Sequence, residues 1–245
     1  MRFQDMNKVP ELYHTAPYLS QTQTRLLHVN LDESDSPYCV LSQTIFYPQG
    51  GGQLGDRGYL VLPDMLTSQQ KMGVVTTKRK DEEIRHYLDI NEIGFDLLKK
   101  QAGQQATAIL DWDLRYHQMR IHSAVHLIHC ILEQVTGHSI PYPVRSPLND
   151  ESGENHYQLL DYIDENILEK ATTELNEFCL SGHEIQTVDV PEQGNNFRIW
   201  KCGRWSIPCG GTHVKDTKEI GMIFSTLKVK KNMTRIALRL SDNSG

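Results

Sequence analysis

Two pairs of metal-ligand side chains, far apart in the sequence, constrain this chain more than any other feature. His122 and His126 stand four residues apart in a segment of helical period, so both imidazoles would lie on one helix face and reach a single ion. Cys209 and His213 are also four apart, in a loop with two glycines that can fold back on itself. A thiolate with imidazoles suits Zn²⁺ better than Mg²⁺ or Ca²⁺, which prefer oxygen ligands. The sequence therefore predicts a zinc site of three histidines and one cysteine.

The spacing alone does not decide the role of this zinc ion. The residues between the two histidines are Ser123, Ala124 and Val125, so the glutamate that serves as general base in HExxH metalloproteases is missing. Four protein ligands would saturate a tetrahedral ion, as in structural sites, whereas catalysis needs an exchangeable position. Both a structural and a catalytic zinc remain open at this point.

The composition limits the class of protein. Hydrophobic residues make up 38% of the chain and charged residues 23%, which predicts a soluble globular protein with a buried core. No run approaches the roughly 18–20 apolar residues of a membrane helix. The first residues lack the apolar segment of a signal peptide, so we expect a cytoplasmic protein with no membrane partner. The five cysteines, an odd and scattered set, do not indicate a disulfide framework.

Charge is unevenly distributed along the chain. The net charge of −6 argues against a general nucleic-acid coat protein. From Arg198 to Arg239, however, there are ten Lys or Arg residues against only Asp216 and Glu219. This locally basic stretch is either a nucleic-acid contact or an ordinary solvated face.

The first part of the chain has the pattern of short strands separated by turn residues. The predicted strands are Cys39–Tyr47, Tyr59–Leu62, Gly73–Thr76, Ile84–Leu88 and Ala106–Leu110. Five short strands with little helix between them predict a small β-barrel over residues 1–110.

The hydrophobic period changes after Asp111. Apolar residues from Leu114 to Thr136 follow a helical stripe, for which Asp113 is the predicted N-cap and Gly137 the predicted stop. A second amphipathic helix is predicted at Tyr162–Leu180, and strands at Ile185–Val190, Met222–Val229 and Thr234–Leu240. The predicted fold is therefore α+β, with the barrel followed by an α/β zinc-binding domain over residues 111–245.

Three motifs together resemble one family. The stretch Arg120 to Leu127 resembles a helix in the editing domain of alanyl-tRNA synthetases, and Cys209 to Val214 resembles the second zinc motif of that domain. Phe46 to Gln53 resembles the glycine-rich stretch of the small barrel that precedes it. No aminoacylation domain precedes the predicted barrel, so the chain resembles the stand-alone AlaX-type editing proteins of middle length. Threonyl-tRNA synthetases carry a related module, and fold alone does not fix the tRNA.

The resemblance implies an activity and a partner. Such a protein would act in trans on free aminoacyl-tRNA and hydrolyse the ester of mischarged tRNA(Ala), chiefly seryl-tRNA(Ala) and in some cases glycyl-tRNA(Ala). It would hold one zinc ion per chain, which would activate a water, polarise the ester carbonyl or only position the aminoacyl 3′ end. The oligomeric state stays open.

Further residues become site candidates under this resemblance. Gln53 would orient substrate or water as a catalytic residue, or serve as an ordinary turn residue. Thr212 would form a hydrogen bond beside the metal or brace its loop. Gly51 and Gly52 would let the backbone pass close to the substrate. Phosphate contacts are predicted at Lys228, Lys230, Lys231 and Arg235, for which the alternative is a solvated strand edge.

One segment departs from the family pattern. Relatives that edit serine commonly place a small hydroxyl residue after the zinc helix, facing the substrate side chain, but here Pro141 and Pro143 interrupt that stretch. Ser139 or Tyr142 would line the substrate pocket instead. Two alternative functions therefore remain: a deacylase for a different aminoacyl ester, and a non-catalytic tRNA or amino-acid binding module with a structural zinc.

Overall fold

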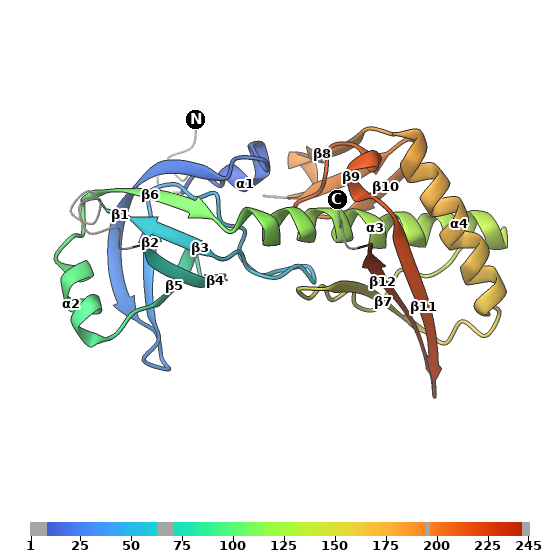
Figure 1. The fold of residues 1–245 in the computed structure, drawn as a ribbon, viewed down its shortest axis with the longest axis horizontal. Coiled ribbons are helices and arrows are strands. Elements are labelled where there is room, and N and C mark those ends of the chain that lie inside the picture. The colour runs from blue at the N-terminus through green and yellow to red at the C-terminus, as the bar shows by residue number, and fades with distance from the viewer. Residues whose placement is uncertain (1–8, 63–70, 195–196, 242–245) are drawn as a thin grey trace. The chain divides into compact units, whose positions relative to one another are not determined.

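The computed structural model describes residues 9–62, 71–194 and 197–241. The chain forms two compact units (Figure 1), the first made of Met1–Gly50 and Leu54–Arg115, the second of Gly51–Gln53 and Tyr116–Gly245. The mixed α+β class is confirmed.

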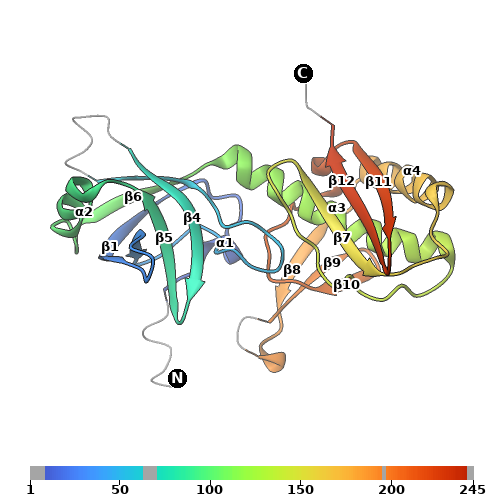
Figure 2. The ribbon, with the colours of Figure 1, turned by 90° about the horizontal axis from the view of Figure 1, so that it is seen from below.

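The first unit is a closed antiparallel barrel of six strands. Around the barrel the strand order is β1-β2-β5-β4-β3-β6. The strands are β1 (Gln21–Leu31), β2 (Pro37–Leu41), β3 (Gly58–Val61), β4 (Met72–Lys80), β5 (Glu83–Asp89) and β6 (Gln105–Leu110), and two helices accompany them, α1 (Leu12–Thr15) and α2 (Glu92–Lys99). Side chains of alternate residues, such as Leu26, Leu60 and Ala108, fill the interior and are at most 1% exposed. Figure 2 shows β4 and β5 as one long hairpin.

For this unit one predicted strand is too long and one strand was not predicted. The strand predicted at Cys39–Tyr47 ends at Leu41, because the backbone that follows has other partners. Thr44 bonds to the backbone of Pro10 and Leu12, and the amides of Phe46 and Tyr47 donate to the side chains of Thr44 and Asp56. The sequence prediction also missed β1, the longest strand of the barrel. Its alternation is broken by a bulge between Leu26 and His28, and polar residues dominate its first half.

A histidine is buried without charge in the barrel. His86 is 1% exposed; its Nδ1–H donates to the carbonyl of Cys39 at 3.2 Å, and its Nε2 accepts from the Thr44 hydroxyl at 2.8 Å. Burial lowers the pKa of His86 from 6.5 to about 4, since the surrounding barrel disfavours the imidazolium.

We therefore expect that His86 lowers the free energy of unfolding as the pH falls. Because the folded pKa is the lower one, the unfolded chain binds more protons between about pH 6.5 and about pH 4, and the contribution of His86 is lost as the pH falls through that window. Between about pH 7 and about pH 5 this loss is about 2 kcal/mol. Urea unfolding at both pH values should show a smaller loss for His86→Gln than for the wild type; equal losses would contradict the assignment.

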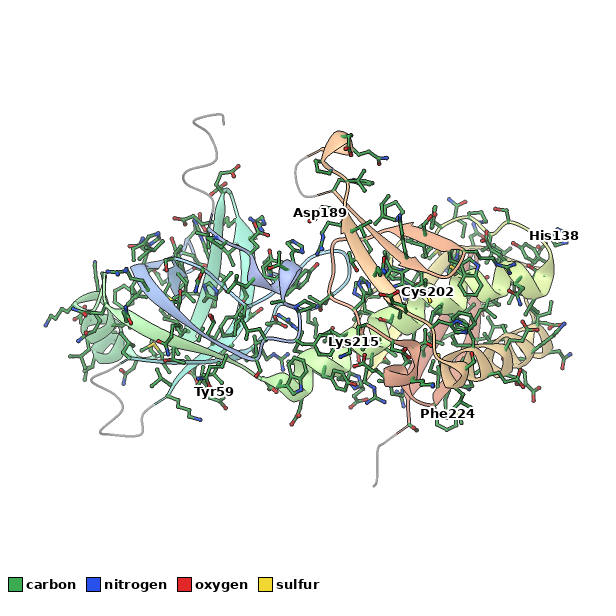
Figure 3. The ribbon with its side chains drawn as sticks, turned by 90° about the horizontal axis from the view of Figure 1, so that it is seen from above. Tyr59, His138, Asp189, Cys202, Lys215 and Phe224 are labelled. Carbon is green, nitrogen blue, oxygen red and sulfur yellow. The ribbon has the colours of Figure 1, made fainter. Side chains whose placement is uncertain are left out.

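The second unit places one long helix between two three-stranded sheets. In Figures 1 and 2, α3 (Trp112–Thr136) runs between the sheet β10-β9-β8 and the sheet β11-β12-β7, and α4 lies beside the latter. The remaining elements are β7 (Ser152–Gln158), α4 (Glu165–Ser181), β8 (Ile185–Asp189), β9 (Arg198–Cys202), β10 (Trp205–Pro208), β11 (Ile223–Lys230) and β12 (Met233–Leu240), with short 3₁₀ helices at Pro191–Gln193 and Thr217–Ile220. Cys202, labelled in Figure 3, is buried on β9.

The two long helices were predicted, with errors at their starts. The cap of α3 is Asp111 rather than Asp113, since Asp111 Oδ1 accepts from the amide of Leu114 at 3.2 Å. Helix α4 begins three residues later than predicted, where Asp164 accepts from the amide of Ile167 at 2.8 Å. Gly137, with a positive φ of 70°, does end α3. The sequence prediction missed β7, β9 and β10.

None of the helices in the described residues is both long enough and apolar enough to cross a membrane.

Candidate metal centre

The structure brings His122, His126, Cys209 and His213 together in the second unit. Helix α3 presents the two histidines one turn apart, and the loop after β10 carries Cys209 and His213. All four ligand atoms lie within 4.8 Å of one another. Cys209 Sγ is 3.5 Å from His122 Nε2 and 3.6 Å from His213 Nε2. A tetrahedral ion with bonds of about 2.3 Å to sulfur and about 2.0–2.1 Å to nitrogen would separate these atoms by about 3.6 Å. The two distances from Cys209 therefore match those of a tetrahedral metal site.

Burial prepares the histidines of this cluster for coordination. Burial lowers the pKa of His122 to about 4, and burial with neighbouring imidazoles lowers the pKa of His126 and of His213 well below 6.5. The imidazoles are therefore neutral near pH 7. Burial raises the pKa of the Cys209 thiol to about 11, so this thiol becomes a thiolate only beside a cation. His126 Nε2 is buried and has no hydrogen-bond partner among the described residues, which is the condition of an unused metal ligand.

Gln53 and Thr212 form the support of His122. Gln53 is 1% exposed, and its Oε1 accepts from His122 Nδ1 at 3.1 Å and from the Thr212 amide at 2.9 Å. Its Nε2 donates to Thr212 Oγ1 at 2.8 Å. The Gln53 contact keeps the proton of His122 on Nδ1 and leaves Nε2 free for a metal. Of the two side chains predicted as catalytic, that of Gln53 contacts the ligand His122, and that of Thr212 contacts Gln53.

Two glycines allow this packing. A Cβ on Gly211 would lie 2.3 Å from His122 Cε1, so any side chain there would collide with a ligand. Gly52 has a φ of +90°, and its Cβ would lie 1.9 Å from the carbonyl oxygen of Ser146. Gly51 is exposed, with open space around its Cβ position.

Two neighbours of the cluster were not predicted from the sequence. Thr187 on β8 has its Oγ1 3.4 Å from His213 Nδ1, where it supports His213 as Gln53 supports His122. Trp200 on β9 is fully buried, with its ring centroid 5.2 Å from that of His126. No local pattern marks either residue, because strand pairing brings them to the site from 60 or more residues away from the helix histidines.

The other predicted site residues lie outside the cluster. Ser139 is exposed and its hydroxyl donates to Glu133 Oε1 at 3.2 Å. Tyr142 is 61% exposed and stacks on His129, with ring centroids 5.3 Å apart. Lys228 and Lys230 lie on β11, Arg235 on β12, and Lys231 in the turn between these strands.

The chain is similar in sequence to several known proteins. A family model described as the threonyl and alanyl tRNA synthetase second additional domain matches residues 197–237. The alanyl-tRNA editing protein AlaX-M of Pyrococcus horikoshii is 31% identical over 219 residues, which cover 89% of this chain and 90% of that protein. This chain belongs to the AlaX-type alanyl-tRNA editing family.

Two more relatives show how the chain relates to longer proteins. AlaX-L of the same organism is 30% identical over 252 residues, which cover 93% of this chain and 57% of AlaX-L. The chain therefore spans little more than half the length of that relative. The alanine–tRNA ligase of Alkaliphilus metalliredigens is 30% identical over 218 residues, which cover 80% of this chain and 23% of the ligase. The expected membership of the AlaX family is confirmed.

Proposed function

We propose that this chain hydrolyses the ester of mischarged tRNA(Ala) in trans, with seryl-tRNA(Ala) and glycyl-tRNA(Ala) as substrates, and that it uses one zinc ion held by His122, His126, Cys209 and His213. The observation that carries the proposal is the convergence of these four donors, with Cys209 at tetrahedral distance from two of the histidines, in a member of an alanyl-tRNA editing family. Three imidazoles and one thiolate favour zinc over the oxygen-preferring cations.

The residues around the donors have assigned tasks in this proposal. Gln53 fixes the tautomer and ring orientation of His122, and Thr212 holds the Gln53 amide from the other side. Zinc, when bound, supplies a positive charge and Lewis acidity beside the ester carbonyl. Gly51 and Gly52, next to Gln53 in the chain, let the aminoacyl end approach, and Tyr142 lines the path of the side chain.

A second candidate function follows from the number of donors. Four protein ligands fill a tetrahedral ion and leave no exchangeable position, as in structural sites. In that case the chain would bind tRNA or an amino acid without hydrolysing the ester. The hydroxyl of Ser139 is engaged with Glu133 and therefore offers no support for serine selectivity.

The proposal is tested by a deacylation panel. Purified zinc-loaded protein is mixed with seryl-, glycyl- and alanyl-tRNA(Ala), and release of the labelled amino acid is followed. We expect release of serine and glycine at rates at least about ten-fold above that of alanine, since a cognate product must be spared. Binding of tRNA without release of any amino acid by a folded, metal-loaded protein would contradict the hydrolase and support the binding module.

A further inference from the structure

A row of basic side chains crosses the sheet β11-β12-β7. Strand register places Lys228 opposite Arg235 and Arg235 opposite His156. An isolated bridge beyond β7 places His156 opposite Arg145. Directly paired residues point to the same face of a sheet, so these four side chains share one face. Lys230 and Arg239 have the same parity on their strands and lie on that face too.

This face is the one that the helices leave open. On the other face, Asn155 Nδ2 donates to the carbonyl of Val125 on α3 at 2.8 Å, and the hydroxyls of Ser225 and Thr172 are 2.5 Å apart between β11 and α4. Side chains alternate along a strand, so Lys228 points away from both helices. Phe224, in the same alternation and labelled in Figure 3, is 60% exposed.

Arg145 is held in place by its neighbours. Its Nε donates to His156 Nδ1 at 2.9 Å, and the opposite nitrogen of that ring contacts the Glu154 carboxylate. This chain of contacts orients the guanidinium plane at the surface. The terminal nitrogens of Arg145 make no hydrogen bond or ion pair with any residue that the structure describes.

Few negative charges neutralise the cations on this face. Within the described ranges, Lys228, Lys230, Arg235 and Arg239 form no ion pair, and the contact of Glu154 is with His156. Like charges placed directly opposite each other destabilise a sheet, as for Lys228 and Arg235. A ligand that carries several negative charges along a line would relieve this repulsion.

The face also connects to the metal centre within the same unit. Asn155, next to His156, is bonded to Val125, the residue before His126. Ser146, next to Arg145, has its carbonyl oxygen against Gly52, the residue before Gln53.

We propose that this face, made of Arg145, Lys228, Lys230, Arg235 and Arg239, binds the phosphodiester backbone of the tRNA near its aminoacylated end, with Arg145 forking a phosphate through its two terminal nitrogens. The proposal rests on the proposed function for the identity of the nucleic acid. Guanidinium groups bind phosphate in this two-pronged way, and lysines add charge without sequence preference.

The test measures binding of uncharged tRNA(Ala) across a range of KCl concentrations. The variant Arg145→Gln Lys228→Gln Arg235→Gln removes three charges from the face. Its control, Lys170→Gln Lys201→Gln Lys218→Gln, removes three exposed charges from α4, β9 and the 3₁₀ turn of the same unit. The face variant should bind at least about ten-fold more weakly, and its slope of log affinity against log salt should be shallower by about 2–3, since each lost phosphate contact removes about 0.7–0.9. The control should match the wild type.

Measurements of deacylation and metal content distinguish a defect in tRNA binding from a defect in the hydrolytic site. We expect a raised KM with an unchanged kcat and full metal content in the face variant. If the face variant binds tRNA with the affinity and salt slope of the wild type, the proposed binding surface is wrong, even where the wild type deacylates normally. If the face variant has a shallower salt slope but the wild type does not deacylate any substrate, the binding surface is supported and the proposed function is wrong. If the triple variant does not fold, Lys228→Gln alone should make the salt slope shallower by about 0.7–0.9, the value of one phosphate contact.

Discussion

Replacing His122 and His126 together by alanine is expected to remove the bound metal and to lower kcat/KM for deacylation by more than about 100-fold. Two of four donors would be lost, and even removal of a supporting contact outside the ligand set costs about 10–100-fold in metal affinity or activity. Burial keeps both imidazoles neutral and able to coordinate, and alanine offers no donor in their place. The measurements are the zinc content of the purified protein and the rate of serine release from seryl-tRNA(Ala).

The comparison variants for this experiment act on Gln53. Gln53→Ala leaves all four donors but frees the Nδ1 of His122, so metal affinity should fall by about 10–100-fold and excess zinc should restore the rate. Gln53→Glu keeps an acceptor for the same Nδ1–H and should retain zinc better. Full activity of the double histidine variant, in a protein without bound metal, would disprove the zinc-dependent mechanism.

Replacing Arg115 by methionine is expected to lower the free energy of unfolding by about 3–5 kcal/mol, because it leaves a buried carboxylate without its partner. Arg115 is 1% exposed and Asp56 is 3% exposed. The guanidinium donates from Nε to Asp56 Oδ1 at 3.0 Å, from Nη2 to the carbonyl of Ile45 at 2.7 Å and from Nη1 to that of Pro17 at 3.1 Å. It thus fixes the irregular, buried segment that follows β2. Urea unfolding of the variant measures the loss.

Two controls show whether the loss comes from the uncompensated charge. Adding Asp56→Asn to Arg115→Met removes the charge but keeps an acceptor for the Tyr47 amide, so part of the stability should return. Lys80→Met, which removes an exposed partner of Glu33, should change stability little. A loss for Arg115→Met no larger than that for Lys80→Met would contradict the argument.

Local spacing in the sequence is sufficient for several features. The pairing of His122 with His126 follows from helix geometry, which puts residues four apart on one face whatever surrounds them. The long amphipathic helices, the end of α3 at Gly137 and most barrel strands also follow from short-range patterns. The family membership was readable because its three motifs are themselves short segments. Each of these features depends on residues that lie close together in the sequence.

Only the tertiary structure determined which side chains from distant segments contact each other. Gln53 and Thr187 support the metal-site histidines only because backbone segments 69 and 26 residues away are packed against them. The basic row exists only because strand register sets Lys228, Arg235, His156 and Arg145 in line, and a shift of one residue would turn a strand's side chains to the other face. The path after Leu41 departs from a strand because Thr44 bonds to the distant backbone of Pro10 and Leu12 and the Tyr47 amide donates to the Asp56 side chain. Each outcome depends on the packing of many side chains at once, which no local period in the sequence encodes.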